Sequence, residues 1–130
     1  MPSIFSKIIV GEIPCYKIAE SAQCLAFLDI NPLTKGHVLV IPKTEIDYIF
    51  DLENDSFIQL HLFAKTVAIA LKKAIPCNRI GVTVIGLEVP HAHIHLIPIN
   101  EMNDMNFNNK KLSFTKEEFA EITDSITQFI

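Results

Sequence analysis

Three histidines alternate with apolar residues between Pro90 and Pro98, and they form the stretch of this 130-residue chain best suited to chemistry. Successive side chains of a β-strand point to opposite faces. A strand over residues 91–99 would therefore place His91, His93 and His95 on one face, about 7 Å apart in sequence order. The apolar residues between them would face a core. Because unpaired buried polar groups are costly, three neighbouring imidazoles indicate a site with its own partners.

The spacing alone is compatible with three interpretations. In the first interpretation, the histidines are polar residues on a solvent-facing strand, although three in strict alternation argue against that. In the second, they share one metal ion, as three histidine ligands do in some zinc enzymes. Alternatively, an imidazole acts as nucleophile or as acid and base, since this side chain titrates near neutrality. Spacing does not separate the second interpretation from the third.

The elements that must position the histidines can be predicted from the pattern of apolar residues. Helical spacing of Phe57, Leu60, Ala64, Val67 and Leu71 predicts a long helix over 54–74. The pair Thr115 and Glu118 is a capping-box signature that predicts a last helix over about 113–129. A short helix is expected over 4–11, and strands are expected over 15–19, 23–29, 37–41, 79–85 and 91–99. We therefore predict an α+β fold.

Bulk properties limit the class of protein. The length predicts a single domain over residues 1–130. The net charge of −4 with scattered lysines argues against nucleic acid as a partner, and no apolar run is long enough for a membrane span. The three cysteines are odd in number and far apart, so they suggest no disulfide framework. The start does not resemble a secretory signal. A cytoplasmic protein without a cofactor is expected.

Four blocks of the sequence resemble the histidine-triad (HIT) family, in its Hint-like branch. They are the histidine motif, the N-terminal Ile4–Pro14, Leu25–Pro32 and Gly36–Lys43, and the resemblance covers about residues 3–100 in the family's order. It implies a five-stranded antiparallel sheet with one long helix and a C-terminal helix. It also implies a homodimer that cleaves a purine nucleotide, a phosphoramidate or a dinucleoside polyphosphate, at its α-phosphate.

The resemblance assigns roles to individual residues. His93 would attack phosphorus and form a nucleotidyl-histidine, His95 would contact phosphate oxygens, His91 would orient His93 through its carbonyl, and His37 would assist proton transfer. Asp29 would accept hydrogen bonds from the ribose hydroxyls. The expected slot for the base contains Ile4, Phe5, Ile8, Phe27, Ile30 and Leu39, and the expected border of the phosphate site is formed by Glu88 and Val89.

Two departures from the family matter for function. Many relatives carry an Asn and a Gly-Gln pair before the triad, whereas this chain has a shorter loop with Leu87 at the Gln position. Some bacterial relatives hold a structural zinc with two cysteines near the start and a histidine after the Pro-Lys. Here Ser3, Ser6 and Glu45 stand at those positions, so we predict no metal. A nucleotide-binding protein with little catalysis and a metal-binding protein remain the alternatives.

Overall fold

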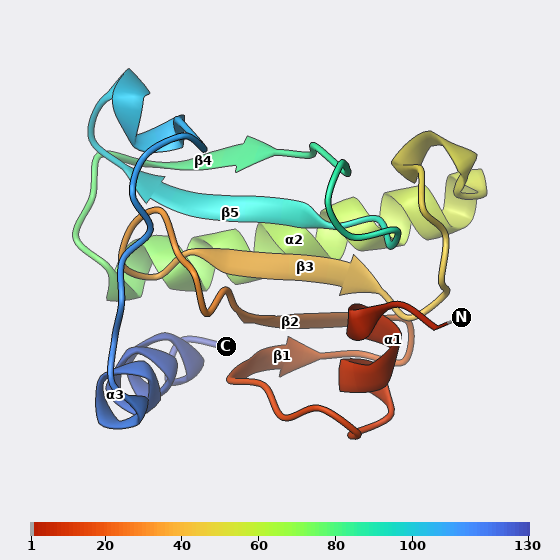
Figure 1. Cartoon of the computed structure of the whole chain (residues 1–130), viewed down its shortest axis with the longest axis horizontal. Helices are drawn as coiled ribbons and strands as arrows, with labels where there is room; N and C mark the ends of the chain where they lie inside the picture. The colour runs from red at the N-terminus through yellow and green to blue at the C-terminus, as the bar shows by residue number, and fades with distance from the viewer. Residues whose placement is uncertain (1) are drawn as a thin grey trace.

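Five strands form one antiparallel sheet in the computed structural model, which describes residues 2–130 (Figure 1). The strands lie across the sheet in the order β1-β2-β3-β5-β4. Their bounds are β1 Lys17–Glu20, β2 Cys24–Leu28, β3 Val38–Pro42, β4 Arg79–Thr83 and β5 Ile94–Ile99. The predicted sheet is confirmed. The predicted ends differ by a few residues, since β1 begins at Lys17 rather than residue 15 and β4 ends at Thr83 rather than residue 85.

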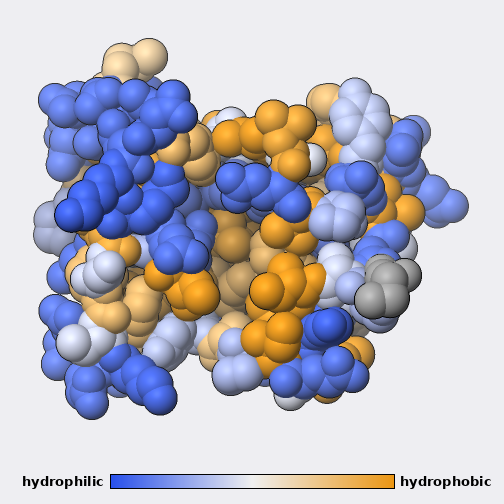
Figure 2. Space-filling model, viewed as in Figure 1, coloured by the Kyte–Doolittle hydropathy of each residue, from blue (hydrophilic) through white to orange (hydrophobic). Residues whose placement is uncertain are grey.

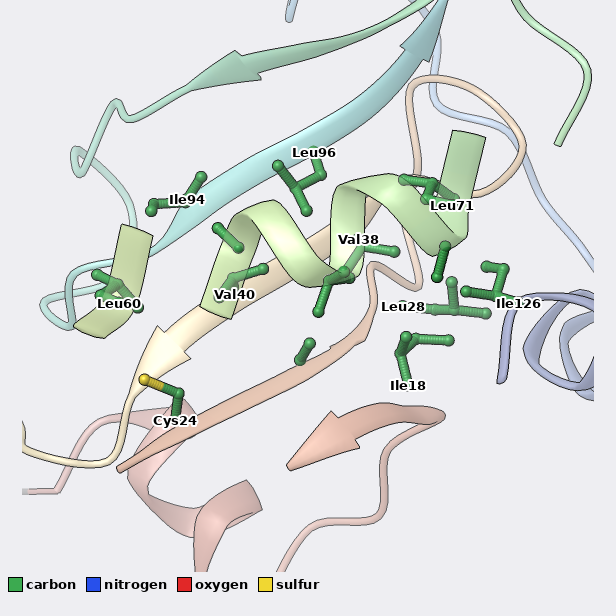
Figure 3. Close-up of a cluster of buried hydrophobic side chains, with 14 of the residues drawn as sticks. Ile18, Cys24, Leu28, Val38, Val40, Leu60, Leu71, Ile94, Leu96 and Ile126 are labelled. Carbon is green, nitrogen blue, oxygen red and sulfur yellow. The ribbon is translucent and has the colours of Figure 1, made fainter. Parts of the chain in front are cut away.

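The long helix α2 (Asn54–Ala74) has the predicted bounds and crosses one face of the sheet. Leu60 and Leu71 are fully buried against β3 and β5 (Figure 3). Burying a side chain of this size contributes roughly 1.5–3 kcal/mol, so the apolar stripe fixes the helix on the sheet. Among residues 2–130, no helix combines the length and the apolar character that crossing a membrane would require.

The two terminal helices lie on different parts of the sheet. Helix α3 (Lys116–Thr127) begins with the predicted capping box, in which the amide of Glu118 donates to Thr115 Oγ1 and the amide of Thr115 donates to Glu118 Oε1. It packs beside β1, where Phe119 stacks on Tyr16. Helix α1 (Ile4–Ile9) is shorter than predicted and lies on the face opposite α2. The chain turns away at Gly11, whose φ of +84° favours glycine.

The predicted strand over residues 91–99 is wrong at its start, because β5 begins only at Ile94. The sheet explains why, since the last residue of β4 is paired with His95 and the last paired residue of β3 with Ile94. Before that point the amide of Ala92 donates instead to the carbonyl of Ile46, in the loop after β3. His91 and His93 therefore precede the strand, and they are placed by loop contacts rather than by the sheet ladder.

Side chains nevertheless continue to alternate between the two faces of the sheet through this segment. Ala92, Ile94 and Leu96 belong to the core under α2. The rings of His91 and His93 lie on the opposite face against Phe5 of α1. Figure 2 shows this opposite face, with apolar side chains around a recess in its middle and hydrophilic side chains at its left rim.

Candidate active site

His93 is held in a single neutral form by a backbone carbonyl. Its Nδ1 lies 2.7 Å from the carbonyl oxygen of His91, and because an oxygen of this kind only accepts, Nδ1 must carry the proton. Nε2 then has a free lone pair. Burial lowers the pKa of His93 below its ordinary value, so the ring is neutral at neutral pH. The contact with the His91 carbonyl that the family resemblance implies is therefore present.

His37 and His95 form a hydrogen-bonded pair, in which each ring carries its proton on Nε2 rather than on Nδ1 as in His93. The amide of Leu33 donates to His37 Nδ1 at 3.0 Å, so in the neutral ring the proton must be on Nε2. His37 Nε2 lies 2.9 Å from His95 Nδ1 and donates to it. His95 in turn carries its proton on Nε2. Burial lowers the pKa of His37 to about 3 and that of His95 to about 4, so both rings are neutral near pH 7.

Two imidazoles with opposite capabilities therefore lie side by side. The rings of His93 and His95 are 4.9 Å apart between centroids. His93 offers a lone pair on Nε2, whereas His95 offers an N–H donor on Nε2. This combination of a nucleophile and a neighbouring donor suits attack on an electrophilic centre that develops negative charge, such as phosphorus.

The lowered pKa values predict that the protein loses stability in acid. His37 and His95 have folded-state pKa values of about 3 and about 4, against 6.5 for an unperturbed histidine. The unfolded chain therefore binds protons more readily between these values. The stabilisation is complete above about pH 6.5 and is lost as the pH falls through this window. We expect the unfolding free energy to drop between pH 7 and pH 4 by about 3 kcal/mol or less for each ring.

Urea unfolding across this pH range measures the effect, and the variant His37→Asn tests its origin. Asparagine keeps an acceptor for the Leu33 amide but does not titrate, so its stability should depend less steeply on pH than that of the wild type. The matched control is His61→Asn, because His61 is exposed on α2. Equal slopes for His37→Asn and the wild type would contradict the assignment.

Asp29 follows β2, and its side chain lies beside His37. Its Oδ1 accepts from the amide of Asn31 at 2.8 Å, and its Oδ2 lies 3.7 Å from His37 Nε2. Burial raises the pKa of Asp29, yet 20% of the side chain stays exposed. The carboxylate is thus oriented by the Asn31 amide, and part of the side chain remains accessible from solvent.

Most of the residues expected to hold the base form one apolar cluster beside His93. Phe5, Phe27 and Leu39 are buried together, and Ile8 and Val89 pack on them. The ring of Phe5 meets that of His93 edge-on at 5.0 Å between centroids. Ile4 and Ile30 are not in this cluster, since they are 50% and 62% exposed. They lie outside the apolar floor of the site.

The loop before the triad is open to solvent. Leu87 is 88% exposed and Glu88 is exposed as well. The charge of Glu88 acts on both Asp29 and His93, tending to raise the pKa of each. Glu88 therefore lies near enough to add negative charge to the site, as expected for a residue at its border.

The sequence reasoning missed two residues of the polar loop between β5 and α3. The ring of Phe107 lies 4.9 Å from that of His95 and 6.2 Å from that of His37, between centroids. Lys111 lies over the Phe107 ring, and its charge lowers the pKa of both Asp29 and His37. A single phenylalanine in an Asn-rich segment is the one local feature that sets this loop apart, and it does not show that the loop returns to His37 and His95.

A metal site built on the histidines does not fit these hydrogen bonds. Among residues 2–130, the group able to surround an ion is Asp29, His37 and His95, rather than the three histidines of the motif. The nitrogen of His37 that faces this group carries a proton, because its other nitrogen accepts from Leu33. A metal ligand needs a lone pair there. The arrangement favours a proton-donor pair over an ion site.

Comparisons with known proteins agree with the fold and the motif. The sequence model of the family described as HIT domain matches residues 10–102. The chain is 36% identical over 135 residues to an uncharacterized HIT-like protein of Borreliella burgdorferi, covering 98% of this chain and 97% of the relative. It is 41% identical over 103 residues to an adenosine 5′-monophosphoramidase of Schizosaccharomyces pombe, covering 75% and 74%. A solved HIT-like protein from Bartonella henselae, described as involved in cell-cycle regulation, superimposes with a TM-score of 0.86 at 29% identity, covering 98% and 96%.

Proposed function

Because the chain belongs to the HIT domain family, we propose that it is a nucleotide hydrolase or transferase that cleaves a purine nucleotide at its α-phosphate. The observation that carries this proposal is the hydrogen bond from His93 Nδ1 to the His91 carbonyl, which leaves Nε2 free to attack. The relative from Schizosaccharomyces pombe is an adenosine 5′-monophosphoramidase, which supports a nucleoside phosphoramidate as substrate.

The reaction proceeds in two displacements at phosphorus. The lone pair of His93 Nε2 forms a bond to the α-phosphorus as the bond to the leaving nitrogen breaks, and this nitrogen takes a proton from solvent and departs as ammonia. The His91 carbonyl stabilises the positive charge that appears on the ring. Water then attacks phosphorus and gives up a proton to solvent, while the bond to His93 breaks and its electron pair returns to Nε2. In both steps the Nε2 proton of His95 binds an oxygen of the phosphate.

The nucleoside is held on the other side of His93. Asp29 accepts hydrogen bonds from the ribose hydroxyls through the oxygen that Asn31 does not use. The apolar cluster of Phe5, Phe27 and Leu39 supports the base, with Ile8 beside it. The exposed Ile4 and Ile30 would contact the base only from the rim of the recess.

Hydrolysis of adenosine 5′-phosphoramidate tests the proposed function. We expect release of adenosine monophosphate and ammonia by the wild-type protein without added metal. A 2′,3′-dideoxy analogue should be a poorer substrate, because Asp29 would lose its partners. Binding of adenosine monophosphate without turnover of this or other leaving groups would contradict hydrolysis. That outcome would favour a nucleotide-binding protein, a function that the open loop with Leu87 and Glu88 suggests.

We also propose that two copies of the chain associate through β4. We further propose that the protein is in the cytoplasm, where the free thiols of the three cysteines would persist. Strand β4 is an end strand of the sheet, and Val82 on it is 60% exposed. The outer face of α2 beside it carries Ile58, Leu62 and Ile69, each at least half exposed. An unpaired edge next to an apolar surface is suited to a second copy of the same chain.

Sedimentation equilibrium should give twice the chain mass of 14.6 kDa. The variant Ile69→Lys should shift the mass toward that of one chain, because it buries a charge in the proposed interface. The control is Val10→Lys, a similar change at a 70% exposed residue that follows α1. A wild-type mass of one chain would refute the dimer.

A further inference from the structure

A continuous set of hydrogen bonds joins α1 to the loop after β3 and to the first histidine of the motif. Glu45 accepts from the backbone amide of Ser3 and, at 2.8 Å, from the hydroxyl of Ser6. The hydroxyl of Ser3 lies 2.9 Å from His91 Nδ1 and accepts from the amide of Ser6 at 3.0 Å. Four residues from three separate segments thus share one polar cluster.

The directions of these hydrogen bonds follow from the groups involved. His91 Nε2 lies 2.7 Å from the carbonyl oxygen of Pro42, which only accepts, so Nε2 carries a proton. The Ser3 hydroxyl forms a hydrogen bond with the other ring nitrogen, Nδ1. The Ser6 hydroxyl donates to Glu45. The hydrogen bond from the Ser3 amide, followed by that from the Ser6 hydroxyl, lowers the pKa of Glu45 to about 2. Both nitrogens of the His91 ring are consequently held in place.

These residues do not fit a structural zinc. Ser3, Ser6 and Glu45 stand where some bacterial relatives have two cysteines and a histidine, and neutral hydroxyls are poor substitutes for thiolates. The hydroxyls and the carboxylate already bond to one another and to His91. In this chain, protein hydrogen bonds make the connection between α1 and His91.

The cluster ends at the nucleophile. The side chain of His91 is anchored by Ser3 and Pro42, and its backbone carbonyl accepts the Nδ1 proton of His93 at 2.7 Å. Phe5 lies on α1 between the two serines, and its ring meets both His91 and His93 edge-on. A shift of α1 or of the His91 ring would therefore move the carbonyl and the ring surface that orient His93.

We propose that Glu45, acting through Ser3 and Ser6, is a positioning residue that keeps His93 oriented for attack. This inference rests on the proposed function, in which His93 is the nucleophile. Glu45 is exposed and touches no reacting group, so its role is confined to holding α1 and His91 in place.

The test compares Glu45→Ala with Glu45→Gln and with the control Glu12→Ala. Glutamine keeps an oxygen that can accept from both serines, whereas Glu12 is an exposed acid near α1 outside the cluster. With adenosine 5′-phosphoramidate, we expect Glu45→Ala to lower kcat roughly 10- to 100-fold with less than about a twofold change in KM. Glu45→Gln should recover most of the loss, and Glu12→Ala should match the wild type.

A second readout does not depend on turnover. Nitrogen-15 NMR of the histidine rings should show a single Nδ1–H form of His93 in the wild type and a mixture of tautomers in Glu45→Ala. A lower melting temperature with an unchanged His93 spectrum and unchanged kcat would overturn the proposal, since Glu45 would then be merely structural. If the wild type fails to turn over the substrate, the proposed function fails, and the NMR result still decides whether Glu45 positions His93.

Discussion

Replacing His93 with alanine is expected to reduce kcat for adenosine 5′-phosphoramidate by roughly 10⁴-fold or more. In the proposed mechanism, the substitution removes the Nε2 lone pair that attacks phosphorus, which is free because the Nδ1 proton is bound to the His91 carbonyl. It leaves Asp29 and the apolar cluster in place, so adenosine monophosphate should still bind with similar affinity. Steady-state kinetics and calorimetric titration measure the two effects separately.

The loss must be distinguished from a general disturbance of the fold. His93 is 6% exposed, and its removal leaves a cavity beside Phe5, so melting curves should accompany the kinetics. His61→Ala provides a control in which an exposed histidine of α2 is lost. Turnover by His93→Ala within tenfold of the wild type, in a folded protein, would rule out His93 as the nucleophile.

Replacing His95 with alanine is expected to have the next largest effect, a fall in kcat of about 10²- to 10³-fold with little change in KM. The Nε2 proton of His95 is directed by His37, which donates to the opposite nitrogen of the ring. This donor is most useful when negative charge grows on the phosphate oxygens, so its loss raises the barrier more than it weakens binding.

The effect of His95→Ala can be compared with that of His37→Asn. Asparagine still accepts from Leu33 but is too short to reach His95, so the His95 ring stays present without its anchor. We expect a smaller fall in kcat for His37→Asn than for His95→Ala. A rise in KM as large as the fall in kcat for His95→Ala would show that His95 binds the ground state rather than the transition state.

Local sequence patterns were sufficient for the elements whose formation depends on their own residues. Helix α2 follows from its apolar spacing, and α3 begins at the capping box of Thr115 and Glu118. The start of β5 was mispredicted, because the strand's extent depends on where β4 ends and on the Ala92 amide bonding to Ile46. Neither partner is adjacent in sequence.

The candidate site, like the fold, could be predicted only in part from local sequence. The histidines and Asp29 were identified from motifs, yet their proton positions depend on carbonyls and amides that only the fold brings close, such as that of Leu33. Phe107 lies in a segment that is polar in sequence, and nothing local shows that this loop returns to His95. The bonds of Glu45 to α1 span about forty residues of sequence and likewise required the structure.

The stereochemical course of hydrolysis tests the two-step mechanism most directly. The measurement uses an adenosine phosphorothioate amidate of known configuration at the α-phosphorus and water labelled with oxygen-18. Each in-line displacement inverts phosphorus, so attack by His93 followed by attack by water should give overall retention. Overall inversion would show that water attacks the substrate directly, and it would contradict the nucleotidyl-histidine intermediate.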